Sequence, residues 1–157
     1  MSASTAESVG TESTGAGFSA EERASMKARA EELRSDARGG RGAKKAAADE
    51  AALLAKIEDM AQPDRTLAER VHVTVTSTVP DVAPKLMYGQ PAYYRAGKVL
   101  CFFRSGQGDS ERYSTFGFSA EAALDDDAGI WATSYALTEW TESVEAMITD
   151  LLTRATS

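Results

Sequence analysis

The densest group of side chains that could bind a metal is a run of three carboxylates, Asp125, Asp126 and Asp127. Carboxylate oxygens are the ligands that hard cations such as Ca²⁺, Mg²⁺ and oxygen-ligated iron accept. Glu139, at the head of the last predicted helix, could join them. Because adjacent residues point in different directions and the spacing is not that of an EF-hand, a solvated acidic turn is the alternative interpretation. These four residues are therefore a candidate for a weak metal site.

A second group that could do chemistry is aromatic and lies in the middle of the chain, with two cationic residues beside it. Such a set could line a concave face that binds a small molecule. Aromatic residues on strands also form hydrophobic cores, and this is the alternative interpretation. The candidate ligand-binding residues are Tyr88, Gly89, Pro91, Tyr93, Lys98, Phe103, Arg112 and Tyr113.

The residues that most often act in catalysis are scarce, since the chain has one histidine, His72, and one cysteine, Cys101. A catalytic triad, a His/Cys zinc site and a histidine acid–base pair all need more than this. Cys101 lies in the most apolar segment, where burial keeps a thiol unreactive. A single cysteine also excludes an intramolecular disulfide. The sequence thus predicts no catalytic residue and favours a binding protein over an enzyme.

A central run of strands must position these side chains. Residues 99–103 are a short apolar run bounded by glycines, which is typical of a strand buried on both faces. A second strand is predicted at 112–118, and the glycine-containing loop between the two indicates a hairpin. Shorter extended segments at 85–88 and 92–95 precede them, and one near 134–138 follows. The interpretation is an antiparallel meander.

The N-terminal part of the chain has a different character. Residues 1–17 are almost free of apolar side chains and are expected to be disordered. Ser19-Ala20-Glu21-Glu22 forms a capping box that begins a charged helix with a thin apolar face. Three interpretations of this helix, over residues 19–38, stay open. It is exposed to solvent, it docks weakly on the domain through its one apolar stripe, or it is an arm that binds a partner. The predicted organisation is a disordered segment at 1–17, a charged helix with a Gly-rich linker at 18–42, and one domain at 43–157.

Three more helices are predicted in that domain. The first spans about 43–61, and the second runs from Pro63 to about Thr78. Within the second, residues 70–78 also fit a strand, because Val71, Val73 and Val75 alternate with polar residues. Thr141 caps the last helix, which has the clearest apolar stripe. The fold class is therefore α+β, with helices packed on a three- to five-stranded, mainly antiparallel sheet.

Charge and hydropathy limit the partners. Residues 46–157 carry 9 basic and 17 acidic side chains, a net charge of −8. This acidity repels phosphate backbones, so nucleic-acid binding is not expected, whereas cations are allowed. The alternative is that acidity only maintains solubility. No apolar run approaches the roughly 20 residues of a membrane span, and no secretory signal is visible, so we expect a cytoplasmic protein.

The central stretch resembles a known family signature. Tyr88-Gly89-Gln90-Pro91-Ala92-Tyr93 is followed by a Gly97-Lys98 turn and then by the apolar strand. This pattern resembles that of the YdhG-like family (domain of unknown function 1801), which has a Tyr-Gly-Met-Pro-Ala-aromatic segment, a Gly-Lys turn and an apolar strand. Gln90 stands where the family usually has methionine. The resemblance covers roughly residues 46–155.

The resemblance implies a compact α+β domain and a non-enzymatic binding function. Some family members are described as frataxin-like iron chaperones, which bind iron through acidic surface residues and pass it to iron–sulfur or haem assembly. The resemblance therefore permits iron as a ligand of this chain. Two alternatives stay open: a small-molecule pocket formed by the aromatic residues on the sheet, and a protein-interaction module that uses the helix at 19–38.

Overall fold

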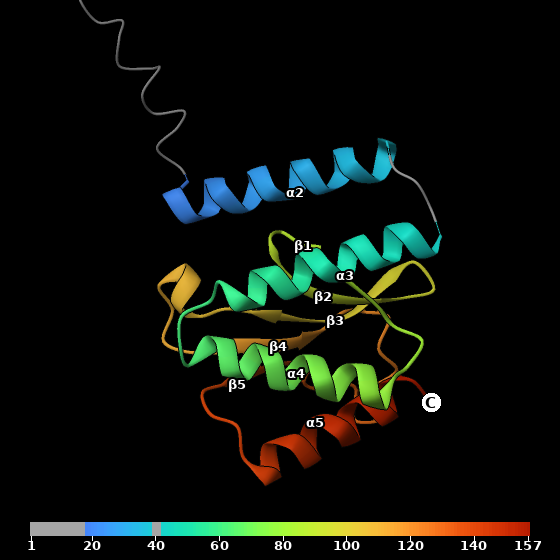
Figure 1. The fold of residues 1–157 in the computed structure, drawn as a ribbon. Coiled ribbons are helices and arrows are strands. Elements are labelled where there is room, and N and C mark those ends of the chain that lie inside the picture. The colour runs from blue at the N-terminus through green and yellow to red at the C-terminus, as the bar shows by residue number, and fades with distance from the viewer. Residues whose placement is uncertain (1–17, 39–41) are drawn as a thin grey trace, which may run out of the picture.

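The computed structural model describes residues 18–38 and 42–157, and within them it has an α+β fold with one five-stranded sheet (Figure 1). The helices are α2 (Ala20–Arg38), α3 (Ala43–Glu58), α4 (Asp64–Thr78) and α5 (Glu142–Ala155). The strands are β1 (Ala83–Met87), β2 (Gln90–Arg95), β3 (Lys98–Arg104), β4 (Ser114–Phe118) and β5 (Ser134–Leu137), with a 3₁₀ turn, η1 (Gln107–Asp109), between β3 and β4.

The strands pair in the order β1-β2-β3-β4-β5, and every pair is antiparallel. The predicted fold class and the antiparallel meander are therefore confirmed. Two of the connections are as short as a hairpin permits: Tyr88-Gly89 joins β1 to β2, and Ala96-Gly97 joins β2 to β3. All four of these residues have positive φ angles, which the twist of such two-residue hairpins requires.

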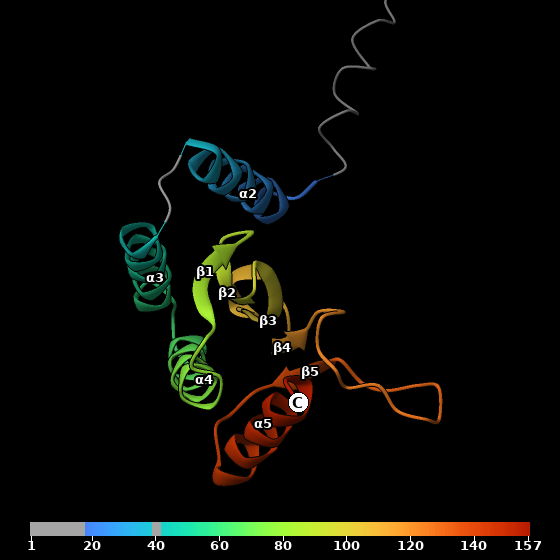
Figure 2. The ribbon, with the colours of Figure 1, turned by 90° about the vertical axis from the view of Figure 1, so that its right-hand side faces the viewer.

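Helices α3, α4 and α5 cover one face of the sheet and enclose the core with it (Figure 2). Alternation along the strands sends every second side chain to this face, and the helices meet it with apolar stripes. The largest side chains with almost no exposed surface are Tyr93, Phe103, Phe116, Leu53, Ile57, Leu100, Leu152, Val71 and Val75.

The segment whose sequence fitted both helix and strand is helical. In α4, Leu67, Val71 and Val75 are buried, whereas the Val73 side chain is 60% exposed. A strand would place Val71, Val73 and Val75 on the same face, so the burial pattern follows helical spacing. The predicted cap of α5 is also present, since the Thr141 hydroxyl accepts a hydrogen bond from the Val144 amide at 3.1 Å.

Helix α2 lies outside this core, alongside β1 (Figures 1 and 2). Its predicted capping box is present: the Ser19 hydroxyl accepts from the Glu22 amide at 3.0 Å, and Glu22 Oε1 accepts from the Ser19 amide at 2.7 Å. The predictions for residues 1–17 and for the linker at 39–41 lie outside the described residues. Over residues 18–38 and 42–157, none of the helices has the length and hydropathy of a membrane span.

Candidate functional site

The structure does not bring the eight predicted ligand-binding residues into one pocket. Tyr93 and Phe103 have no exposed surface, and Pro91 is buried with them, because these strand residues face the helices. Lys98 is exposed and lies 3.9 Å from Glu121, and Arg112 and Tyr113 lie together beyond η1. Arg112 and Tyr113 border a small hollow of about 90 Å³ beside the start of α4, whereas Tyr88 and Gly89 lie at larger hollows on the other side of the β3–β4 loop.

The predicted metal ligands are also separated. Asp125, Asp126 and Asp127 are exposed on the long segment between β4 and β5, and Glu139 is exposed beyond β5. Asp126 Oδ1 accepts a hydrogen bond from the Ala128 amide at 2.8 Å, which is the pattern of a local turn. Within 18–38 and 42–157, no three His, Cys, Asp or Glu side chains are placed to hold a metal ion.

His72 belongs to a polar chain inside the fold that the sequence did not reveal. Its Nδ1 lies 3.0 Å from the Tyr93 hydroxyl, and its Nε2 lies 3.5 Å from Glu50 Oε2. Burial lowers the pKa of His72, and Glu50 opposes this shift. Burial also raises the pKa of Tyr93 and of Cys101. Because a carboxylate oxygen of Glu50 faces Nε2, the neutral ring carries its proton on Nε2, and Nδ1 accepts from the Tyr93 hydroxyl.

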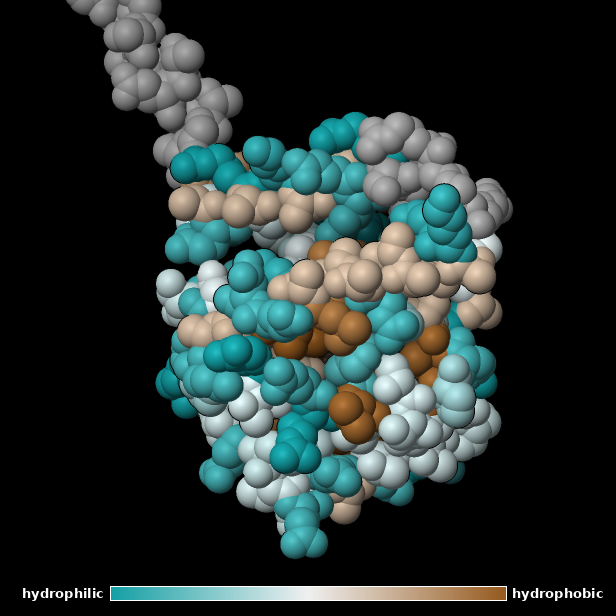
Figure 3. All heavy atoms as spheres, viewed as in Figure 1, coloured by the Kyte–Doolittle hydropathy of each residue, from teal (hydrophilic) through white to brown (hydrophobic). Residues whose placement is uncertain are grey.

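The main candidate site is the β1–β2 turn, formed by Tyr88 and Gly89. It borders an open cleft of about 370 Å³ between α2, α3 and β1. Figure 3 shows the molecular surface hollowed between α2 and α3. A second hollow of about 280 Å³ lies on the other side of the turn, against Phe102 and Arg104. The turn therefore stands at the junction of two concave surfaces.

The amides of the turn point away from the sheet. In a two-residue hairpin the flanking residues, here Met87 and Gln90, form the last pair of the ladder. The N–H groups of Tyr88 and Gly89 are then left without a strand partner and must find another acceptor. The Glu32 carboxylate of α2 supplies both acceptors: Oε1 lies 3.1 Å from Tyr88 N, and Oε2 lies 3.0 Å from Gly89 N.

Other α2 residues contact the same turn. The Ser25 hydroxyl donates to the Tyr88 carbonyl oxygen at 3.1 Å, so the turn is bonded through both its N–H and C=O groups. The Arg29 guanidinium lies 5.3 Å from the centre of the Tyr88 ring, and its Nη1 is 3.8 Å from Glu32 Oε1. The cation thus stacks on the aromatic face while it supports the carboxylate.

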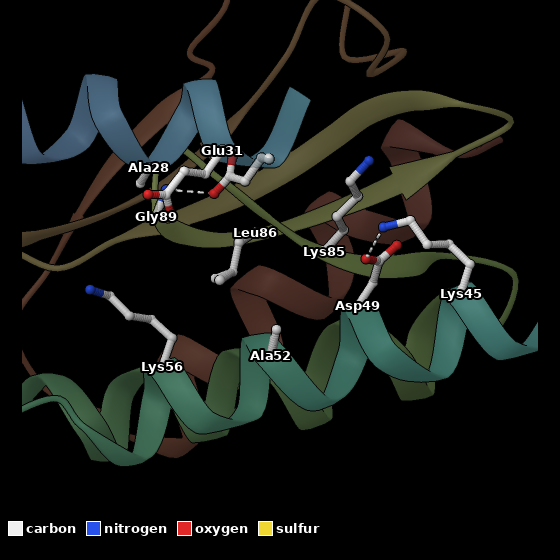
Figure 4. A pocket seen from close by; sticks show the side chains of 10 residues that line it. Ala28, Glu31, Lys45, Asp49, Ala52, Lys56, Lys85, Leu86 and Gly89 are labelled. Atoms are coloured by element: carbon white, nitrogen blue, oxygen red, sulfur yellow. Dashed lines mark hydrogen bonds and ion pairs between the residues drawn. The ribbon is translucent and has the colours of Figure 1, made fainter. Parts of the chain in front are cut away.

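The two sides of the cleft differ in charge. The α3 and β1 walls carry Lys45, Lys56, Lys85 and a single carboxylate, Asp49, whose Oδ1 is 2.7 Å from Lys45 Nζ. The α2 wall carries the Glu31 and Glu32 carboxylates. The side chains that line the cleft in Figure 4 are Ala28 and Glu31 of α2, Lys45, Asp49, Ala52 and Lys56 of α3, and Lys85, Leu86 and Gly89 of β1 and its turn.

Polar contacts join Gln90, the residue that follows the turn, to the β3–β4 loop and through it to α4. Gln90 Oε1 accepts from the Ser105 amide at 3.2 Å, which ties the start of β2 to the β3–β4 loop. Buried Asp64, at the start of α4, accepts from the Gln107 amide at 2.9 Å and from the Ser105 hydroxyl. Gln90, the departure from the family pattern, therefore has a structural partner.

Comparison with protein-family models, curated proteins and solved structures found no match to this chain. The resemblance to the YdhG-like family therefore stays a prediction that rests on the residues of β2, β3 and their turns. Of the residues that carry it, Gly89 lines the cleft of about 370 Å³ and Tyr88 precedes it in the same turn.

Proposed function

We propose that this protein is a non-enzymatic binding domain of the YdhG-like kind, whose ligand occupies the cleft between α2, α3 and β1. One observation carries the proposal: the turn at Tyr88-Gly89, part of the family-like motif, directs two backbone donors, both bonded to Glu32, toward a cleft of about 370 Å³ that Gly89 lines. Concave sites with a few convergent polar groups are the usual binding sites for small molecules.

The chemistry around the cleft supports binding rather than catalysis. The sole histidine of the chain is bonded to Tyr93, and the sole cysteine is fully buried in β3. Neither lines the cleft. A nucleophile paired with a histidine base is therefore not built there. What the cleft offers is charge, backbone donors and an apolar floor that includes Leu86 and Ala52.

A ligand screen on the full chain, read by ¹H–¹⁵N spectra, tests this proposal, because the amide signals of Tyr88 and Gly89 report from the turn. Ala52→Trp places an indole in the cleft. The matched control is Ala51→Trp, since Ala51 is also exposed and is turned about 100° from Ala52 on the helix. We expect compounds that shift both signals in the control to lose this effect in Ala52→Trp.

Two results would contradict the proposal. One is a library of acids, bases and neutral compounds that yields no saturable shift at Tyr88 and Gly89. The other is a set of ligands that bind Ala52→Trp and the control equally well, which would place their site elsewhere on the protein.

The resemblance supports a second proposal, an iron-donating chaperone, and the net charge of −8 over residues 46–157 favours cation binding. Anaerobic calorimetric titration with Fe²⁺, with Mg²⁺ and Ca²⁺ as controls, tests it. Saturable, iron-selective heat that disappears in an Asp125/Asp126/Asp127→Ala variant would support iron donation. Equal weak heat with all three ions would argue that the acidity serves solubility.

A further inference from the structure

We infer that the β1–β2 turn is a carboxylate-binding site and that Glu32 of α2 is its tethered occupant, displaced by a small organic carboxylate with a short apolar body. The inference deepens the proposed function, on which it rests, by naming the chemical class of the ligand. It also gives α2 a role, that of an intramolecular competitor for the cleft.

The geometry of the turn selects a carboxylate. Two adjacent N–H groups, of Tyr88 and Gly89, meet the two oxygens of one carboxylate at 3.1 and 3.0 Å. This bidentate pattern requires two acceptor atoms about as far apart as those of a carboxylate, and charge strengthens both bonds. A primary amide offers one acceptor and one donor, so it would satisfy a single N–H and oppose the other.

The cleft beside the turn fits the rest of such a ligand. Leu86, Ala28 and Ala52 give it an apolar lining next to the donors. With the Glu32 carboxylate displaced, the lining keeps three lysines, at 45, 56 and 85, against two carboxylates, those of Asp49 and Glu31. This positive surface in an acidic protein attracts anions to the turn. A volume of about 370 Å³ suits a small molecule rather than a folded partner.

The attachment of α2 is suited to displacement. Its larger apolar side chains are not buried, since Met26 is 43% exposed and Leu33 is 51% exposed. The contacts that join the helix to the turn are instead the polar ones made by Ser25 and Glu32 and the ring contact of Arg29. A carboxylate that binds the same two amides therefore competes with few interactions, while the chain keeps Glu32 nearby at a high effective concentration.

The test uses 4-phenylbutyrate as the probe and its neutral amide, 4-phenylbutyramide, as the control ligand, with ¹H–¹⁵N spectra of the full chain. Glu32→Gln removes the competitor's charge and one of its two acceptors. Glu31→Gln is the matched control, because Glu31 lines the same cleft without bonding the turn. We expect the Tyr88 and Gly89 signals of Glu32→Gln to titrate with an affinity about tenfold tighter than wild type.

The controls define the remaining outcomes. Glu31→Gln removes the same charge from the cleft but no acceptor from the turn, so it should tighten binding far less than Glu32→Gln does, and 4-phenylbutyramide should give no saturable shift at the two amides. Ser25→Ala loosens α2 but keeps Glu32, so it should tighten binding by a smaller factor and serves if Glu32→Gln disturbs folding. Equal affinity in wild type, Glu32→Gln and Ser25→Ala, equal binding of acid and amide, or no saturable binding of the acid would overturn the inference. Ligands whose binding is blocked by Ala52→Trp but whose affinity is unchanged by Glu32→Gln would overturn the inference about Glu32. They would leave the proposed binding function intact.

Discussion

Replacing His72 by glutamine should remove the pH dependence of stability between pH 7.5 and 5.5. In the folded state burial lowers the pKa of His72 below its ordinary value of 6.5. The unfolded chain therefore binds a proton below about pH 6.5 that the folded chain resists. Stability falls as the pH is lowered through this range and is fully present above it. Because the chain has one histidine, no second imidazole obscures the effect.

The change in the free energy of unfolding that His72 can cause has an upper limit. One proton contributes at most about 1.4 kcal/mol per pH unit to the free energy of unfolding. The carboxylate of Glu50, whose Oε2 lies 3.5 Å from His72 Nε2, favours the protonated ring and keeps the loss below that limit. Since Glu50 is itself 44% exposed, solvent screens its contribution. We expect wild type to lose stability on going from pH 7.5 to 5.5, by no more than about 1.4 kcal/mol.

Urea denaturation at the two pH values measures this difference. In His72→Gln the free energy of unfolding should change by less than about 0.3 kcal/mol over the same interval, within ordinary surface effects. A pH dependence in His72→Gln equal to that of wild type would refute the reasoning, because another group would then be responsible. A wild type that is more stable at pH 5.5 than at 7.5 would show that Glu50 outweighs burial.

Three further predictions concern packing and reactivity. Gly106→Ala should destabilise by about 2–3 kcal/mol in urea denaturation, because the added methyl group would lie 2.2 Å from a backbone oxygen, whereas Gly108→Ala meets a contact at 3.4 Å and should cost under about 1 kcal/mol. Leu53→Ala should cost about 2–5 kcal/mol because Leu53 has no exposed surface, while its 41%-exposed neighbour, changed by Leu54→Ala, should cost less than half as much. The Cys101 thiol, buried and with a raised pKa, should react with a thiol reagent at the rate of unfolding, and rapid reaction in native buffer would contradict its burial.

Apolar spacing made the fold predictable. Val71 and Val75 in α4 show their burial through helical spacing, and the run that became β3 shows it through its short length, its glycine bounds and its aromatic and β-branched residues. The capping box at Ser19 was equally local, because its two partners are three residues apart. The choice between helix and strand at 70–78 depends on whether Val73 is buried together with Val71 and Val75. Val73 is exposed, and only the assembled core shows this.

The candidate site was only partly predictable. Tyr88 and Tyr93 looked alike in sequence, but Tyr93 lies in β2 facing the helices while Tyr88 lies in the turn, so one is core and the other borders the cleft. Strand alternation could have separated them once the turn was placed at 88–89. The contact of Glu32 with the turn spans 56 residues of chain and leaves no periodic trace in the sequence.

The order of the sheet has a consequence for how the protein acquires its structure. Because each strand pairs with its neighbour in the chain, hairpins such as β1–β2 and β2–β3 can close over short loops, one after another, at little entropic cost. The docking of α2 cannot be part of that early assembly, since its acceptor group bonds a turn that forms only when β1 and β2 have paired. Helix α2, although it precedes the sheet in the chain, therefore docks only after the β1–β2 hairpin has formed.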